Sequence, residues 1–197
     1  VKFKKDHLEN KHKKTIAATM FGLTTPCVEH ARKILESKDY EVLVFHATGS
    51  GGKSMEKLIE DSHIDAVLDI TTTEWCDELF GGILNAGEHR LEAAINKGIP
   101  EVVSLGALDM INFGPVDSLP ENMKNRTMYK HNPTTTLIRT NVEENILLGK
   151  KIAEKLNKAS REIILLIPTK GFSGLDIKNQ EFYNKEADEA LINTLKN

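Results

Sequence analysis

A glycine-rich segment, Gly49-Ser-Gly-Gly-Lys-Ser54, has the residue types and spacing that most clearly indicate chemistry. Glycines let a backbone approach an anion closely, and a helix N-terminus offers unpaired N–H groups with positive potential. Lys53 adds a positive charge. The segment therefore predicts phosphate or carboxylate binding. Ala47 stands where G-x-x-x-x-G-K-[ST] has its first glycine, and Ser54 where G-x-G-x-x-G has its third. The alternative is an ordinary strand–helix turn with glycines for close packing.

A cysteine and a histidine form a second candidate pair. Thr25 is a good N-cap and Pro26 suits the first helical position, which places Cys27 in the first turn of a helix. The helix dipole there favours a thiolate. His46, at the end of the next strand, is a candidate base for nucleophilic catalysis. The alternative is that Cys27 is a small buried residue beside a helix cap, and Cys76 is expected to be packing as well.

Two acids complete the candidates. Glu74 follows three threonines and is either a general base or a cap for the next helix. Asp109 lies in a loop of Gly, Leu, Met and Ile, where an acid needs a partner or a ligand. The predicted binding set is Thr24, Thr25, Thr48, Gly49, Ser50, Gly51, Gly52, Lys53, Thr72 and Asp109. No metal site is expected, because the seven histidines show no H-x-x-x-H pair and the cysteines no C-x-x-C pair.

Short apolar runs alternate with amphipathic segments, and these elements must position the candidates. Strands are predicted at 15–20, 41–46, 65–70, 101–105 and 162–167, and helices at 26–38, 53–61, 74–80, 88–97, 141–158 and 185–195. Asn141-Val-Glu-Glu144 has the spacing of a capping box. This alternation predicts a doubly wound, mainly parallel α/β sheet with helices on both faces, a Rossmann-like fold that binds ligands at the carboxyl ends of its strands. The strand order cannot be read from the sequence.

Residues 106–140 are predicted to be long and irregular, with Pro115, Pro120 and Pro133. Loops of that length in a small domain are usually functional or contact a partner. One part is a candidate lid over the ligand, and another a candidate dimer contact.

Composition limits the function classes. The chain has 197 residues, 40% hydrophobic and 28% charged, with a formal net charge of −3, values typical of one globular domain. That balance argues against a nucleic-acid binder, and no apolar run approaches the roughly 20 residues of a membrane span. Two cysteines and no secretory leader predict a cytoplasmic protein. The polar residues 1–13, which begin at Val1, are expected to be a linker or the tail of a preceding domain. Residues 14–197 then form the α/β domain.

Six motifs together resemble one known family. They are Thr19–Cys27, Val44–Gly52, Asp69–Glu74, Gly106–Pro115, His131-Asn-Pro133 and Arg139-Thr140. From about Lys13 onward the chain resembles the uncharacterised conserved family of Tm-one-like ATP-binding domain proteins, which includes a tobamovirus-resistance protein of tomato. The resemblance implies ATP or related nucleotide binding and no established reaction. It also implies that this region is the second of two Rossmann-like halves. Lys178-Asn-Gln-Glu181 departs from relatives, which have a glycine before Phe182-Tyr183, and this weakens the case for a ligand contact from the last loop, although Gly171, Ser173 and Asp176 match.

Three hypotheses of function remain open. The first is a nucleotide- or phosphometabolite-binding half-protein that forms a homo-oligomer and needs its N-terminal half for a complete site. The second is an enzyme acting on a small carbonyl or phosphorylated metabolite through Glu74, Asp109, His46 or Cys27. The third is a protein-interaction module that uses residues 106–140. Fold alone does not choose among them.

Overall fold

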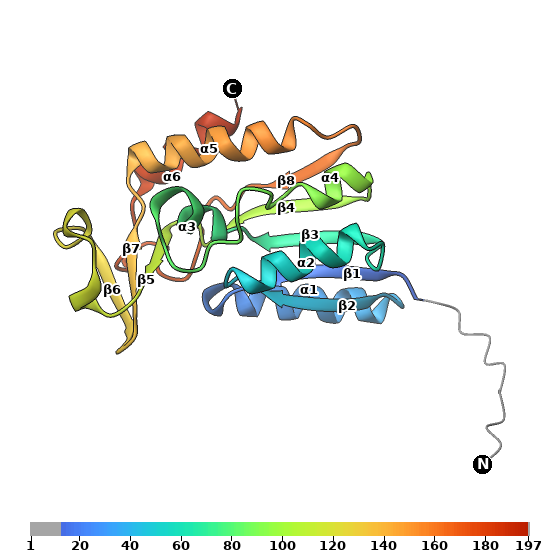
Figure 1. Cartoon of the computed structure of the whole chain (residues 1–197), viewed down its shortest axis with the longest axis horizontal. Helices are drawn as coiled ribbons and strands as arrows, with labels where there is room; N and C mark the ends of the chain where they lie inside the picture. The colour runs from blue at the N-terminus through green and yellow to red at the C-terminus, as the bar shows by residue number, and fades with distance from the viewer. Residues whose placement is uncertain (1–12, 197) are drawn as a thin grey trace, which may run out of the picture.

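Five parallel strands form the main sheet in the order β2-β1-β3-β4-β8 (Figure 1). The computed structural model describes residues 13–196, so the predicted linker lies outside the described residues except for Lys13. The strands are β1 (Thr15–Met20), β2 (Glu41–His46), β3 (Ala66–Thr71), β4 (Glu101–Gly106) and β8 (Ile163–Leu166). From β1 the chain moves to β2 on one side and then to β3 on the other. This confirms the doubly wound α/β prediction and places the switch in strand order between β1 and β3.

Helices cover the two faces of this sheet unequally. They are α1 (Thr25–Ser37), α2 (Ser50–Glu60), α3 (Glu74–Phe80), α4 (Ala93–Lys97), α5 (Val142–Leu156) and α6 (Lys185–Lys196). On one face α1 packs Val28 against Ala18 and Met20 of β1. On the other, α2 packs Met55 against Ala17, and α5 and α6 pack against each other beside β4 and β8. None of the helices within residues 13–196 has the length and hydropathy needed to cross a bilayer.

Most element boundaries match the prediction, and the exceptions have local causes. The capping box of α5 forms, since Asn141 accepts from the Glu144 backbone. Helix α2 begins at Ser50 rather than residue 53, because Gly49, at φ +84°, turns the chain directly into it. The predicted helix 88–97 is wrong before Ala93. Leu91 has φ +69°, and the Glu56 carboxylate accepts from the Leu91 and Ala93 N–H groups, which holds this part in turns.

The prediction of an irregular segment at 106–140 is also wrong. It contains a three-stranded antiparallel sheet, β5-β7-β6, in which β5 is Met110–Phe113, β6 is Met128–Asn132 and β7 is Thr135–Arg139. The strands are short, and the end of β6 is exposed and polar, so no alternating pattern marks it. The small sheet stands beyond the carboxyl ends of the main strands, at the left of Figure 1. Met110 and Leu137 pack with Leu175 and Phe182, which extends the core past the main sheet.

Candidate functional site

Hydroxyl groups join the ends of β1 and β3 at the switch in strand order. Thr19 donates to Asp69 at 2.6 Å, and its oxygen accepts from the Thr71 N–H at 2.9 Å. The hydroxyl oxygens of Thr24 and Thr71 lie 2.7 Å apart. All four side chains are buried. The predicted residue Thr24 therefore ties the loop after β1 to β3, with its hydroxyl engaged inside the protein.

Glu74 lies against the glycine-rich loop. Its Oε1 accepts from the N–H groups of Gly49 at 2.7 Å and Gly52 at 3.1 Å. Gly49 is the N-cap of α2 and Gly52 its third residue, so an acid from α3 satisfies N–H groups that a helix start leaves unpaired. In this structure the N–H groups of the loop bind the protein's own carboxylate, and the binding of a phosphate or of a ligand carboxylate stays a prediction.

Arg90 balances this carboxylate and was missed by sequence reasoning. Its Nε donates to Glu74 Oε2 at 2.8 Å, while its two terminal nitrogens donate to Asp69 at 2.6 and 2.8 Å. A fourth contact reaches a third carboxylate, that of Glu56, at 3.2 Å. Burial raises the pKa of Glu74, and the charge and hydrogen bond of Arg90 oppose that rise. Only a long-range contact distinguishes Arg90 from a surface arginine, so no local signal identifies it.

Two glycines of the loop are required by close packing. A Cβ at Gly51 would overlap the carbonyl oxygen of His46, and one at Gly52 would overlap the Glu74 carboxylate. The contacts made by these two residues agree with the close-packing interpretation of the loop. Substitution at either position would disturb the fold as well as any ligand, so a test of binding needs other residues.

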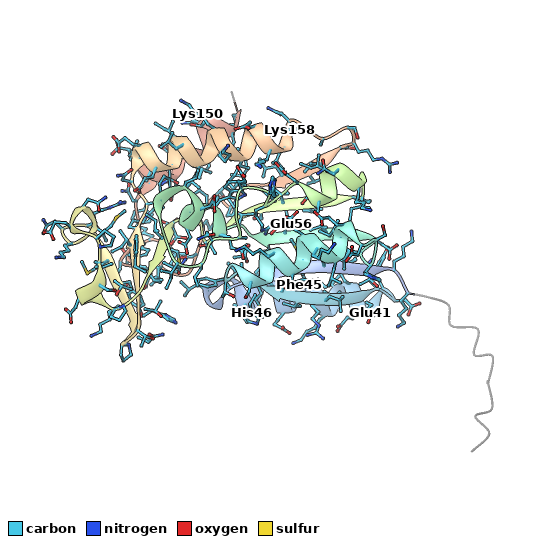
Figure 2. The ribbon with its side chains drawn as sticks, viewed as in Figure 1. Glu41, Phe45, His46, Glu56, Lys150 and Lys158 are labelled. Atoms are coloured by element: carbon cyan, nitrogen blue, oxygen red, sulfur yellow. The ribbon has the colours of Figure 1, made fainter. Side chains whose placement is uncertain are left out.

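The remaining predicted residues divide by exposure. Thr72 is buried and donates to the Ser104 carbonyl at 3.0 Å. Thr25 and Thr48 are half-buried and donate to nearby carbonyls at 3.1 and 3.3 Å. The exposed members lie at or after the ends of β1 and β2 and are Cys27, His46, Ser50 and Lys53. Figure 2 shows His46 and Glu41 at the two opposite ends of β2. A ligand can reach this group directly.

The two cysteines have opposite environments. Cys27 is exposed in the first turn of α1, so the interpretation of it as a buried packing residue is wrong. The reason is that α1 turns Val28, not Cys27, toward the sheet. Cys76 is fully buried, its Sγ lies 3.4 Å from the Leu108 carbonyl oxygen, and burial raises its thiol pKa well above the ordinary value.

Asp109 belongs to a separate polar cluster. Ser173 donates to its Oδ2 at 2.7 Å, while its buried Oδ1 has no partner among the described residues. Nearby, Arg139 donates to Asp176 at 3.1 Å and to Asp188 at 2.5 Å. Burial raises the pKa of Asp109 to about 7. Its polar contacts therefore lie with the connection after β8 and not with the glycine-rich loop.

Within residues 13–196, no group of three or more His, Cys, Asp or Glu side chains is placed to hold a metal ion. The carboxylates near Arg90 are engaged by its guanidinium and by backbone N–H groups. Their geometry is that of a buried ion-pair network.

A doubly wound α/β domain with polar loops gathered at the carboxyl edge of its sheet is the class that this fold and site define. The chain belongs to the uncharacterised protein family UPF0261, whose C-terminal domain matches residues 13–197. This confirms the resemblance drawn from the six motifs.

Relatives in bacteria and plants share most of this chain. A UPF0261 protein of Clostridium tetani is 59% identical over 93% of the chain, and one of Rhizobium meliloti is 47% identical over 95%. The ToMV resistance protein Tm-1(GCR237) of Solanum lycopersicum is 46% identical over 97%. The chain spans 46% and 47% of the two bacterial proteins and 25% of the tomato protein. No activity follows from these names.

Proposed function

We propose that this domain binds a small phosphorylated ligand, of the class of ATP and related nucleotides, at the carboxyl ends of β1 and β2. The observation that carries the proposal is the first turn of α2. Glu74 takes the N–H groups of Gly49 and Gly52, while those of Ser50 and Gly51 occupy helix positions that have no acceptor inside a helix. The exposed side chains of Ser50 and Lys53 stand in the same turn.

The phosphate would be held by direct and supporting residues. Lys53 supplies charge, while Ser50, Thr48 and Thr25 supply hydroxyls around it. Repulsion from Glu74 is reduced, because Arg90 shares that carboxylate's charge at 2.8 Å. Thr24, Thr72 and Asp109 are buried and bonded internally, so their role is to fix the loops rather than to touch the ligand.

The test is ATP binding by calorimetry, with and without magnesium. Lys53→Ala and Ser50→Ala should each weaken binding by about tenfold, the effect of losing one hydrogen bond to a charged group. Lys57→Ala is the matched control, because Lys57 lies on the same helix but pairs with Asp61 at 2.9 Å. The proposal fails if wild type binds no nucleotide, or if Lys57→Ala weakens binding as much as Lys53→Ala does.

One observation favours an enzyme as the second candidate. Cys27 and His46 are both exposed at the carboxyl edge of the sheet, where Met20, the last residue of β1, pairs with His46, the last residue of β2. An exposed thiol in a first helical turn is a candidate nucleophile, and His46 is the candidate base from the neighbouring strand. Glu74 and Asp109 are already engaged in buried contacts, which leaves the thiol as the group that such an enzyme would use.

The relatives' length bears on the whole protein. Because the chain covers about half of the bacterial relatives, we propose that a complete site also draws on their other half. Assembly into a homo-oligomer and a cytoplasmic location are parts of the same proposal. Comparing the ATP affinity of this domain with that of a full-length relative tests it, and equal affinities would contradict the need for a second half.

A further inference from the structure

A large cavity lies at the edge of the sheet farthest from β2. It is open to solvent on one side, has a volume of about 1050 Å³, and is lined by the connection after β8 and by α6. Its apolar lining includes Ile167, Ile177, Tyr183 and Ile192. Ile177 and Tyr183 are each 46% exposed and lie together in this lining, and a gathered apolar surface of this kind marks ligand or partner sites. The volume is at the upper end of the range of small-molecule sites.

The rim of this cavity carries unneutralised positive charge. Lys170, Lys178 and Lys196 line it, and no acidic partner within 4.0 Å is found for them among residues 13–196. The two acids of the lining already have cationic partners. Glu189 pairs with Lys185 at 3.0 Å, and Asp188 turns inward to Arg139 at 2.5 Å. The surroundings are thus cationic although the chain as a whole has a net charge of −3.

We propose that this cavity binds an amphipathic anion, an aliphatic chain of medium length that ends in a carboxylate. The aliphatic lining would take the chain, and the lysines at the rim would take the head group by charge complementarity. A nucleotide is a poorer fit, because the lining offers one aromatic side chain, and the α6 N-terminus that lines the cavity carries acids, Glu186 and Asp188, in its first turn. The site is separate from the phosphate site, since β8 and β2 are opposite edges of the sheet.

Chain length and head group can be tested separately. Calorimetry with octanoate, decanoate and dodecanoate should show affinity rising two- to fourfold per methylene group, as expected for a buried chain. Decanol, which has the same tail without the charge, should bind at least about tenfold more weakly than decanoate. Affinity that does not depend on chain length, or decanol that binds as well as decanoate, would overturn the proposal.

Matched variants locate the site. Lys178→Glu should weaken the binding of decanoate at least about tenfold while leaving the binding of decanol unchanged, and Ile177→Ser should weaken the binding of both. The controls are Lys150→Glu on α5 and Ile83→Ser. Ile83 is an apolar residue outside the cavity lining and is 58% exposed, and neither control should change binding. All four positions are exposed, so folding is expected to be intact and melting temperature verifies it. The ligand proposal is rejected if wild type does not bind decanoate and instead forms a dimer that the Ile177→Ser variant dissociates. That result would show that a second copy of the chain covers the cavity.

Discussion

The Glu74 carboxylate and the Arg90 guanidinium meet inside the protein at 2.8 Å, each side chain 1% exposed or less. Arg90 also holds Asp69 of β3 and Glu56 of α2, so one cation joins carboxylates from three elements. The same Glu74 closes the glycine-rich loop through two N–H groups. Breaking this pair should therefore affect both the stability of the sheet edge and the anion chemistry of the loop.

Replacing Glu74 by alanine should destabilise the fold by about 3 kcal/mol, because it leaves N–H groups and part of a buried guanidinium without an acceptor. The vacated position would then attract a free oxyanion. We expect sulfate to raise the melting temperature of Glu74→Ala more than that of wild type when ionic strength is held constant with chloride.

The control for that experiment is Glu78→Ala on the same helix. Glu78 is half-buried and has no hydrogen bond or ion pair among the described residues, so its loss should cost little and create no sulfate response. If sulfate stabilised Glu74→Ala and Glu78→Ala to the same extent, a specific anion position at the loop would be ruled out.

Asp109 should make stability depend on pH. Its pKa is about 7 in the folded state, where burial favours the protonated acid, and about 3.9 when unfolded. The folded state thus binds more protons between these values, so its stability falls as pH rises from about 4 to 7 and stays lower above that. Asp109→Asn removes this group's contribution and should gain on the order of 2 kcal/mol relative to wild type at pH 8.

Urea unfolding at pH 5 and pH 8 measures that difference. Asp117→Asn is the matched control, because Asp117 is exposed and should leave the pH slope unchanged. Some slope will persist in Asp109→Asn, since burial also raises the pKa of Asp77 to about 7 and that of Glu101 to about 8. A slope identical to that of wild type would show that Asp109 is ionised in the fold across this range.

The two cysteines should react at very different rates. Iodoacetamide should modify exposed Cys27 at least about 100-fold faster than Cys76, which becomes accessible only on opening of the core. Mass spectrometry of peptides after timed quenching measures both thiols in one sample. Protection of Cys27 by saturating ATP would support a ligand at the ends of β1 and β2, and modification of Cys76 in the folded protein at the rate of Cys27 would contradict its burial.

Glycine 51 should be intolerant of any side chain. Gly51→Ala places a methyl group against the backbone oxygen of His46, a group that cannot rotate away, and should cost about 3 kcal/mol or more. Gly22→Ala is the control, because no atom lies within 4 Å of a Cβ built there, and it should change stability by less than about 0.5 kcal/mol. Urea denaturation compares the two, and equal costs would refute close packing at Gly51.

The spacing of apolar residues, together with the residues that begin and end helices, was enough to predict the parallel sheet and most of its helices. β1 and β2 have the predicted bounds, and Asn141 with Glu144 marked the start of α5. The antiparallel strands were not predicted, because Met128–Asn132 has the polarity of a loop and owes its conformation to pairing with β7. Strand order is likewise a long-range property that no local pattern encodes.

The site was predicted in part for the same reason. The residue types of the glycine-rich loop predicted an anion there. The contact that the structure shows is made by Glu74, which lies 25 residues from Gly49 in the chain. The segment Gly87-Glu-His-Arg90 has the sequence of a surface turn, yet Arg90 lies buried among carboxylates. Pairings between distant charges are decided by the assembled sheet, so composition and spacing do not show them.

The insertion of the β5-β7-β6 sheet between β4 and α5 has a consequence for the order of folding. β4 ends at Gly106 and its neighbour β8 begins at Ile163, so the final parallel pairing must close a long segment of chain. The β6–β7 hairpin and helix α5 are local and can form before that closure, which lowers its entropic cost. We therefore expect the edge strand β8 to join the sheet last and to be the first main strand to detach, carrying the lining of the large cavity with it.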